Sequence, residues 1–250
     1  MSMLYFIKSS LVVAVLVVWG AATAAGQSLT GNVGSAGITQ GDQSAELRLG
    51  IDSDGNAGGR VHYDYAFAEW YKLRLIGAFS QPDGEDWSFS ALTVENWLQW
   101  SEEAGDGTGF HGGLRLAYGF ADDGGPDEAQ ARLTLTDKFG EGWEWRSNLI
   151  GELEAGSGSR GGLALQARAQ ISLAGQGAVL GTGSWRVGVE YFGELGNTRD
   201  IPGFDDQAHQ IGPVAKLSWP GGVYVQTAVR FGVTDGADDT MAKLFIGRDF

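Results

Sequence analysis

The sequence predicts an all-β protein, a closed antiparallel transmembrane β-barrel of about twelve strands. Apolar and polar residues alternate with a period of two through most of the chain, whereas the helical period is nearly absent. The alternating segments are about ten residues long, the length that a tilted strand needs to cross a bilayer. Glycine is abundant, at 41 of 250 residues, and glycines within strands allow a barrel wall to curve.

Residues 1–25 have the layout of a secretory signal peptide. Lys8 is the only charge before an apolar run over 11–19, and the small residues that follow offer an Ala-x-Ala site ending at Ala24. We expect cleavage near Ala24 or Ala25, because the apolar run is too short to span a membrane. An uncleaved anchor is the alternative. The chain has no cysteine, so disulfides are excluded.

No Pro- or Ser-rich linker divides the rest of the chain, so we expect one domain. Residues 26–42 form an N-terminal extension or plug, and residues 43–250 form the barrel. Ten or fourteen strands are alternatives to twelve, because the connections at 101–109 and 174–182 do not fit the pattern of the others. The predicted strands are 43–52, 60–68, 71–80, 87–99, 110–120, 128–136, 142–154, 162–173, 183–194, 208–219, 223–233 and 240–250.

Basic side chains recur on the polar face of nearly every predicted strand. In a closed barrel this face lines the lumen, where opposite charges are partly desolvated and pair around the wall. A soluble β-sandwich would also alternate, but its polar faces need not carry the same kind of residue from strand to strand. We expect a ladder of basic residues that sets solute selectivity: Arg48, Arg60, Arg74, Arg115, Arg132, Arg146, Arg168, Arg186, Lys216, Arg230 and Lys243.

Aromatic residues fall near the ends of the predicted strands more often than at their centres. This placement is typical of the two interfacial girdles of a membrane barrel. The expected girdle residues are Tyr63, Tyr65, Tyr71, Trp87, Trp97, Trp100, Tyr118, Phe120, Trp143, Trp145, Trp185, Tyr191, Trp219, Phe231 and Phe250.

The sequence ends on an amphipathic strand over 240–250 whose last residue is Phe250. This resembles the C-terminal strand of bacterial outer-membrane β-barrel proteins, which ends in an aromatic residue and is similar to the signal that their insertion machinery reads. The resemblance implies an outer-membrane location, Phe250 as an assembly signal, and the barrel-assembly machinery as a partner. Arg248 departs from the pattern, because a second aromatic residue is usual there.

The connections fall into two classes if both ends of the barrel domain are periplasmic. Turns after even-numbered strands are mostly short, as at 219–222, and connections after odd-numbered strands are acidic and rich in glycine, as at 196–207. The formal charge of −14 comes mainly from these loops, which does not suit a nucleic-acid partner. Loop acids are favoured turn formers. Alternatively they share Ca²⁺ or Mg²⁺ with lipopolysaccharide phosphates: Asp122, Asp123, Asp200, Asp205 and Asp206.

Candidate catalytic residues are few. His62 and His111 lie on the polar phase of their strands, and His209 lies on the other face near a strand end. Outer-membrane phospholipases and lipid A deacylases use a lipid-facing His and Ser pair, yet no histidine here is followed by Ser two residues later. We therefore expect no enzyme, no cofactor and no metal site.

The predicted function is an outer-membrane, porin-like channel for small polar or anionic solutes. In size and charge pattern the chain resembles small monomeric porins that pass acidic oligosaccharides. The alternative is a non-conducting structural or accessory barrel with acidic extracellular loops. Continuity of the lumen separates the two, since interlocked Arg and Glu pairs or a plug at 27–40 would prevent conduction. Expected partners are outer-membrane lipids, lipopolysaccharide and small solutes, with no nucleic acid.

Overall fold

The computed structural model describes residues 29–100, 108–122, 124–177 and 180–250. The expected signal peptide and its cleavage site lie outside these ranges, as does most of the connection at 101–109. Within the described residues, no helix is long and apolar enough to cross a membrane.

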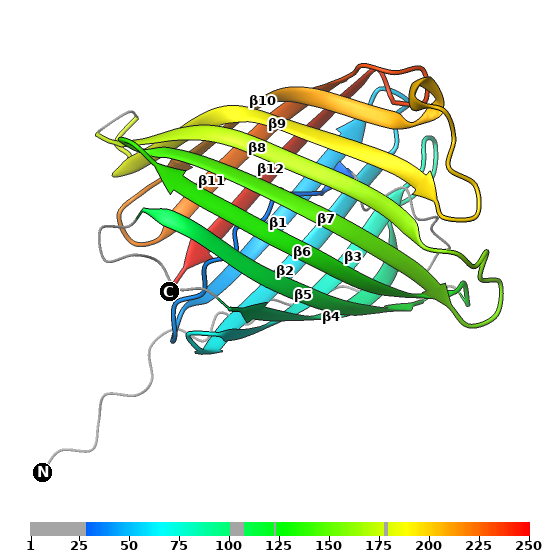
Figure 1. Ribbon diagram of the computed structural model, residues 1–250, viewed down its shortest axis with the longest axis horizontal. Helices are drawn as coiled ribbons and strands as arrows, with labels where there is room; N and C mark the ends of the chain where they lie inside the picture. Colours follow the sequence, from blue (N-terminus) through cyan, green and yellow to red (C-terminus); the bar gives the residue numbers. More distant parts are fainter. Residues whose placement is uncertain (1–28, 101–107, 123, 178–179) are drawn as a thin grey trace, which may run out of the picture.

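Twelve antiparallel strands close into one barrel, in which each strand pairs with its neighbours in the chain and β1 pairs with β12 (Figure 1). The predicted fold is confirmed, and each predicted boundary lies within three residues of the observed one. The two irregular connections do not change the strand number. The strands are β1 (Gln43–Asp52), β2 (Ala57–Ala68), β3 (Tyr71–Gln81), β4 (Ser88–Gln99), β5 (Gly109–Ala121), β6 (Asp127–Phe139), β7 (Trp143–Ala155), β8 (Ala164–Gln176), β9 (Ser184–Asn197), β10 (Ala208–Ser218), β11 (Val223–Gly232) and β12 (Thr240–Asp249).

The barrel is apolar outside and polar inside, the reverse of a soluble protein. On β1, for example, Leu47 and Leu49 are exposed on the outer wall, whereas Glu46 and Arg48 are buried inside. Closure leaves no strand edge, so every strand pairs on both sides. A lipid environment demands both properties, because backbone groups must be satisfied internally and the outer surface must be apolar.

The two ends of the barrel carry different connections. One end holds the start of β1 and the end of β12, where the Phe250 amide donates to the Gln43 carbonyl at 3.0 Å. The β2–β3 and β10–β11 turns lie at the same end, which we call the terminal end. The opposite end carries the acidic connections, including 198–207 with its short 3-10 helix η1 (Phe204–Asp206).

Residues 29–40, which we call the lumen segment, run inside the barrel before the chain turns at Gly41 into β1. Leu29, Thr30 and Val33 are at most 2% exposed. Leu29 lies against Gly50, near the end of β1 that is remote from the terminal end. The Ile38 amide donates to the side chain of Gln99, the last residue of β4, at 2.5 Å. The lumen segment therefore extends along most of the barrel's length.

Candidate lumen site

All eleven predicted ladder residues lie on the inward-facing phase of their strands. Arg48, Arg74, Arg115, Arg132, Arg168, Arg230 and Lys243 are buried, and Arg60, Arg146, Arg186 and Lys216 are half-buried. Their placement follows from the period of two, because one face of each strand must meet the lumen. Lys72 joins them on β3.

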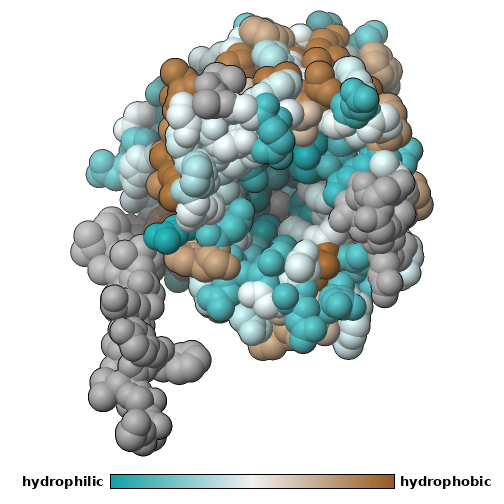
Figure 2. Space-filling model, turned by 90° about the vertical axis from the view of Figure 1, so that its left-hand side faces the viewer, coloured by the Kyte–Doolittle hydropathy of each residue, from teal (hydrophilic) through white to brown (hydrophobic). Residues whose placement is uncertain are grey.

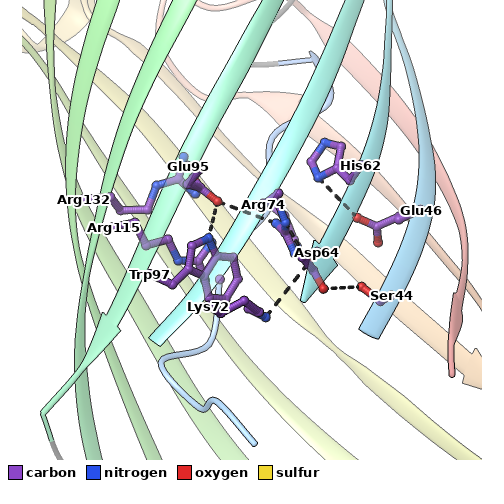
Figure 3. Close-up of polar contacts among 12 residues, drawn as sticks. Ser44, Glu46, His62, Asp64, Lys72, Arg74, Glu95, Trp97, Arg115 and Arg132 are labelled. Carbon is purple, nitrogen blue, oxygen red and sulfur yellow. Dashed lines mark hydrogen bonds and ion pairs between the residues drawn. The ribbon is translucent and has the colours of Figure 1, made fainter. Parts of the chain in front are cut away.

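A first network of charges covers the interior of β1 to β5 near the terminal end (Figure 3). Asp64 is at its centre and accepts hydrogen bonds from Arg74 Nε at 2.8 Å and Ser44 Oγ at 2.8 Å. Lys72 Nζ lies 4.0 Å from the same carboxylate. Asp64 thus compensates two cations and fixes the Arg74 guanidinium by more than one contact.

Trp97 belongs to this network and not to an outer girdle, so its assignment to the girdle was wrong. Its side chain is 7% exposed, its Nε1 donates to Glu95, and its ring is covered by cations (Figure 3). Arg115 Cζ lies 3.3 Å and Lys72 Nζ 3.8 Å from the ring centroid. Trp97 shares the strand phase of Glu95 two residues earlier, which is the signal that could have placed it inside. An indole face stabilises cations in such desolvated positions.

A second network joins β9, β11 and β12. Glu190 has no exposed surface and lies 2.6 Å from Lys243 Nζ and 3.8 Å from Arg230 Nε. Arg230 Cζ also lies 3.7 Å from the ring centroid of Phe192. Glu144 joins β7 to β9, where it pairs with Arg146 and lies 3.1 Å from Arg186. Acids and bases therefore interlock around parts of the wall.

Like charges also face each other across neighbouring strands. Three register pairs place two cations directly opposite one another on the lumen face: Arg48 with Arg60, Arg115 with Arg132, and Arg186 with Lys216. Directly opposed like charges destabilise a sheet. Arg115 contacts the Ser35 carbonyl and the Trp97 ring, and Glu95 is its main electrostatic partner, although the described residues place no carboxylate within 4 Å of its guanidinium. The wall thus keeps cations in excess of what its acids neutralise locally.

Five cations of the wall donate hydrogen bonds to backbone carbonyls of the lumen segment. Arg115 reaches the Ser35 carbonyl at 2.8 Å, and Lys243 reaches that of Gly31 at 2.9 Å. Longer contacts join Arg48 to Thr30 at 3.4 Å, Arg168 to Asn32 at 3.5 Å and Arg146 to Val33 at 3.4 Å. Asn148 binds the Gly34 carbonyl at 3.1 Å and accepts from the Gly34 amide at 2.8 Å. Six successive carbonyls are therefore held by six wall residues.

Two cavities remain beside the lumen segment toward the terminal end. The first has a volume of about 430 Å³, and its lining includes Arg48, Lys72, Arg146, Arg186 and Lys216. The second, of about 540 Å³, is lined by the lumen segment together with side chains such as His111 and Lys138. Figure 2 views this end and shows a hollow lined by hydrophilic residues. An anion entering from this end would meet cations on several sides.

The histidines occupy two environments. His62 and His111 are buried in the lumen, and their ring nitrogens make no hydrogen bond within the described structure. His209 lies on the outer phase of β10, where the η1 connection covers it. Its Nδ1 lies 2.7 Å from the Tyr191 hydroxyl, and its ring stacks on Phe204 at 4.4 Å between centroids. These contacts fasten a connection to the wall.

The acidic connections converge at the end remote from the terminal end. Burial raises the pKa of Asp238, and the nearby carboxylates Asp52 and Asp54 raise it further. Within the described residues, no three acidic or histidine side chains are grouped so that they could hold a metal ion. Asp123 lies outside the described residues.

Comparison with known proteins identifies the fold and does not assign a family. No protein-family model matches the sequence, and no curated protein is significantly similar to it. The KdgM porin has a TM-score of 0.56 at 10% identity, with coverage of 83% of this chain and 99% of the porin. The NanC porin has a TM-score of 0.53 at 10% identity, with coverage of 82% and 98%.

A bacterial polysaccharide outer membrane secretin is similar at a TM-score of 0.50 and 6% identity, with coverage of 85% of this chain and all of the secretin. The protein therefore has the fold of an outer-membrane β-barrel, and the part that aligns with the two porins covers nearly the whole of each of them.

Proposed function

We propose that this protein is an outer-membrane channel for small anionic or polar solutes, and that the inward-facing basic residues select those solutes. The observation that carries the proposal is the set of three directly opposed cation pairs, above all Arg115 with Arg132, because Glu46 and Glu144 already contact one member of each of the other two. Such pairs cost stability in a purely structural wall. An anion between two of these cations relieves their repulsion, so the arrangement favours a lumen that anions visit.

The chemistry suits transient binding. Guanidinium groups bind carboxylate or phosphate oxygens through paired hydrogen bonds, and the low dielectric of the wall strengthens their field. Conduction also requires that each site release its ion, which a series of sites achieves better than one tight site. The cations extend from the cavity residues Arg186 and Lys216 to Lys243 deeper in the barrel. A solute can thus move from one cation to the next.

The outer wall and the loops define the proposed surroundings. The exposed apolar side chains would contact outer-membrane lipids. Phe250, which is 55% exposed beside the β1–β12 seam, is proposed as the signal for the barrel-assembly machinery. The acidic connections would face lipopolysaccharide. Export by the predicted signal peptide would precede all of these steps.

One observation favours a second function, that of a non-conducting accessory barrel. The lumen segment occupies the interior, and Glu190 interlocks with Lys243 and Arg230. If the lumen segment never leaves the barrel, the cations only hold it in place, and the accessory function belongs to the acidic loops.

Single-channel recording separates the two functions. Replacement of Arg115 and Arg168 with Gln removes two cations that contact carbonyls of the lumen segment and, within the described structure, form no ion pair within 4 Å. We expect this variant to lose anion preference in its zero-current potential across a KCl gradient. Arg160→Gln is the control, because Arg160 is exposed in the β7–β8 connection and pairs with Glu154. If neither the folded wild-type protein nor a folded variant without the lumen segment conducts, the channel function is rejected and the accessory function is favoured.

A further inference from the structure

We propose that the lumen segment is a displaceable internal ligand, and that a multivalent anion opens the channel by competing with it for the same cations. The proposal rests on the proposed channel function and adds the regulation of that site. The lumen segment is uncharged throughout, from Leu29 to Gln40. It therefore satisfies donors of the wall without neutralising any of its charge.

Successive backbone carbonyls of the lumen segment act as a row of hydrogen-bond acceptors for the cations. The carbonyls of residues 30, 31, 32, 33 and 35 meet Arg48, Lys243, Arg168, Arg146 and Arg115, one cation for each carbonyl. An anionic oligomer in an extended conformation presents oxygens at comparable intervals. The lumen segment thus occupies the positions that such an anion would take.

Small residues allow this close approach. A Cβ atom at Gly34 would overlap the guanidinium of Arg115, and a Cβ atom at Gly50 on β1 would overlap the Leu29 carbonyl. Gly50 is needed for the backbone of the lumen segment to fit against the wall, whereas a Cβ atom at position 34 would displace the end of the Arg115 side chain. The positions of the two glycines favour a specific seat over chance filling of the interior.

The seat is well suited to exchange. Three of the five cation contacts are 3.4–3.5 Å long and join a charged donor to a neutral acceptor. An anionic acceptor adds to such a charge-assisted hydrogen bond the Coulombic attraction between opposite charges, which a neutral carbonyl cannot supply. Ordering about twelve residues also costs conformational entropy, which opposes seating of the segment. A multivalent anion therefore has the stronger contacts, while the segment has the advantage of being tethered.

The chain offers a natural pivot for the exchange. Gly41 follows the lumen segment and has a φ of 88°, and no atom lies within 4 Å of the position that its Cβ would take. Its amide donates to the Ala66 carbonyl at 2.9 Å, which anchors the chain at the terminal end. The segment can therefore leave the lumen while its base stays attached to β2.

A disulfide tests the displacement directly, because the chain has no native cysteine. The Ala36 amide lies 3.1 Å from the Thr136 hydroxyl on β6, so the pair Ala36→Cys and Thr136→Cys can tie the segment to the wall. The control pair is Asn56→Cys and Asp83→Cys, which joins two outer connections whose contact is 3.2 Å. Each protein is recorded in planar bilayers with sodium tripolyphosphate, oxidised and then reduced.

We expect the oxidised Ala36–Thr136 pair to abolish conductance and reduction to restore it, while the control pair conducts in both states. The single variant Ala36→Cys should react slowly with an impermeant maleimide and faster when tripolyphosphate is added. Sodium chloride of equal ionic strength should not accelerate the reaction. Equal conductance of the tied and reduced protein, or a labelling rate that tripolyphosphate does not change, would overturn the displacement.

Deletion of residues 29–40 distinguishes this failure from failure of the channel function. A deletion variant that conducts with anion preference, beside a tied protein that also conducts, rejects the displacement and keeps the channel. A folded deletion variant that does not conduct rejects the channel itself, and the displacement with it.

Discussion

Glu190 is the carboxylate that compensates the buried cations between β9, β11 and β12. It has no exposed surface and lies between Lys243 and Arg230. Removing Glu190 takes the carboxylate away from two buried cations, whereas removing Glu190 together with Lys243 takes it away from Arg230 alone. The pair is therefore worth testing by single and double replacement.

We expect Glu190→Gln to lower the free energy of unfolding by about 3–5 kcal/mol. Adding Lys243→Met should recover a large part of that loss. Urea titration in detergent micelles measures both values. The matched control is Glu154→Gln, whose partner Arg160 is exposed, and which should cost less than about 1 kcal/mol. Similar small losses at both sites would mean that the buried pair carries little of the stability.

Single residues also mark the limit of what the sequence predicts about the site. The period of two is enough to place Arg132 and Arg168 inside, because one strand face must meet the lumen. It does not identify their partners, which depend on the register between strands. Arg115 and Arg132, for example, become directly opposed only through the β5–β6 register. Trp97 faces the lumen and not the outer girdle, because its position in the alternation of β4, and not its aromatic character, decides which side of the wall it lies on.

Among the elements, the strands could be predicted closely from the sequence and the lumen segment could not. Each strand has its own alternation, and most connections contain glycine or acidic turn residues, so the strand boundaries are local properties. The lumen segment has no period, and its position depends on cations contributed by several strands. Its plug role was expected only as an alternative, and the conformation that seats six carbonyls has no signature in the residues themselves.

The connections at the two ends allow a prediction of orientation. We expect an epitope tag inserted after Gly203 to be reached by antibody on intact cells, because the 198–207 connection is long and acidic. A tag inserted after Gly221, in the tight β10–β11 turn, should bind antibody only after the outer membrane is permeabilised. Equal binding at both tags on intact cells would contradict the orientation.

The last strand, β12, allows a prediction of assembly. Deleting Phe250 should sharply reduce the amount of folded barrel, because this exposed aromatic follows the strand that closes the barrel against β1. Heat-modifiable migration in gel electrophoresis measures the folded fraction. Phe231→Ala is the matched control, since Phe231 is also an exposed aromatic, at 50% against 55%, but lies on β11. Normal assembly of the protein without Phe250 would contradict the proposal that Phe250 is an assembly signal.

At the scale of the whole molecule, charge is divided between two regions. The outer connections carry acids that give the chain its net charge of −14, while the lumen wall carries most of the basic residues. An acidic rim would repel anions at the outer mouth, and the cationic cavities at the terminal end would attract them. We therefore expect the lumen, and not the net charge, to decide ion preference.

The most direct test of the central claim is the zero-current potential of the protein without residues 29–40, measured in planar bilayers across a KCl gradient. We expect conductance steps and a potential of the sign that marks chloride as the more permeant ion, because the freed cations line the path. A potential that marks potassium as the more permeant ion, or a folded protein without conductance steps, would contradict the account.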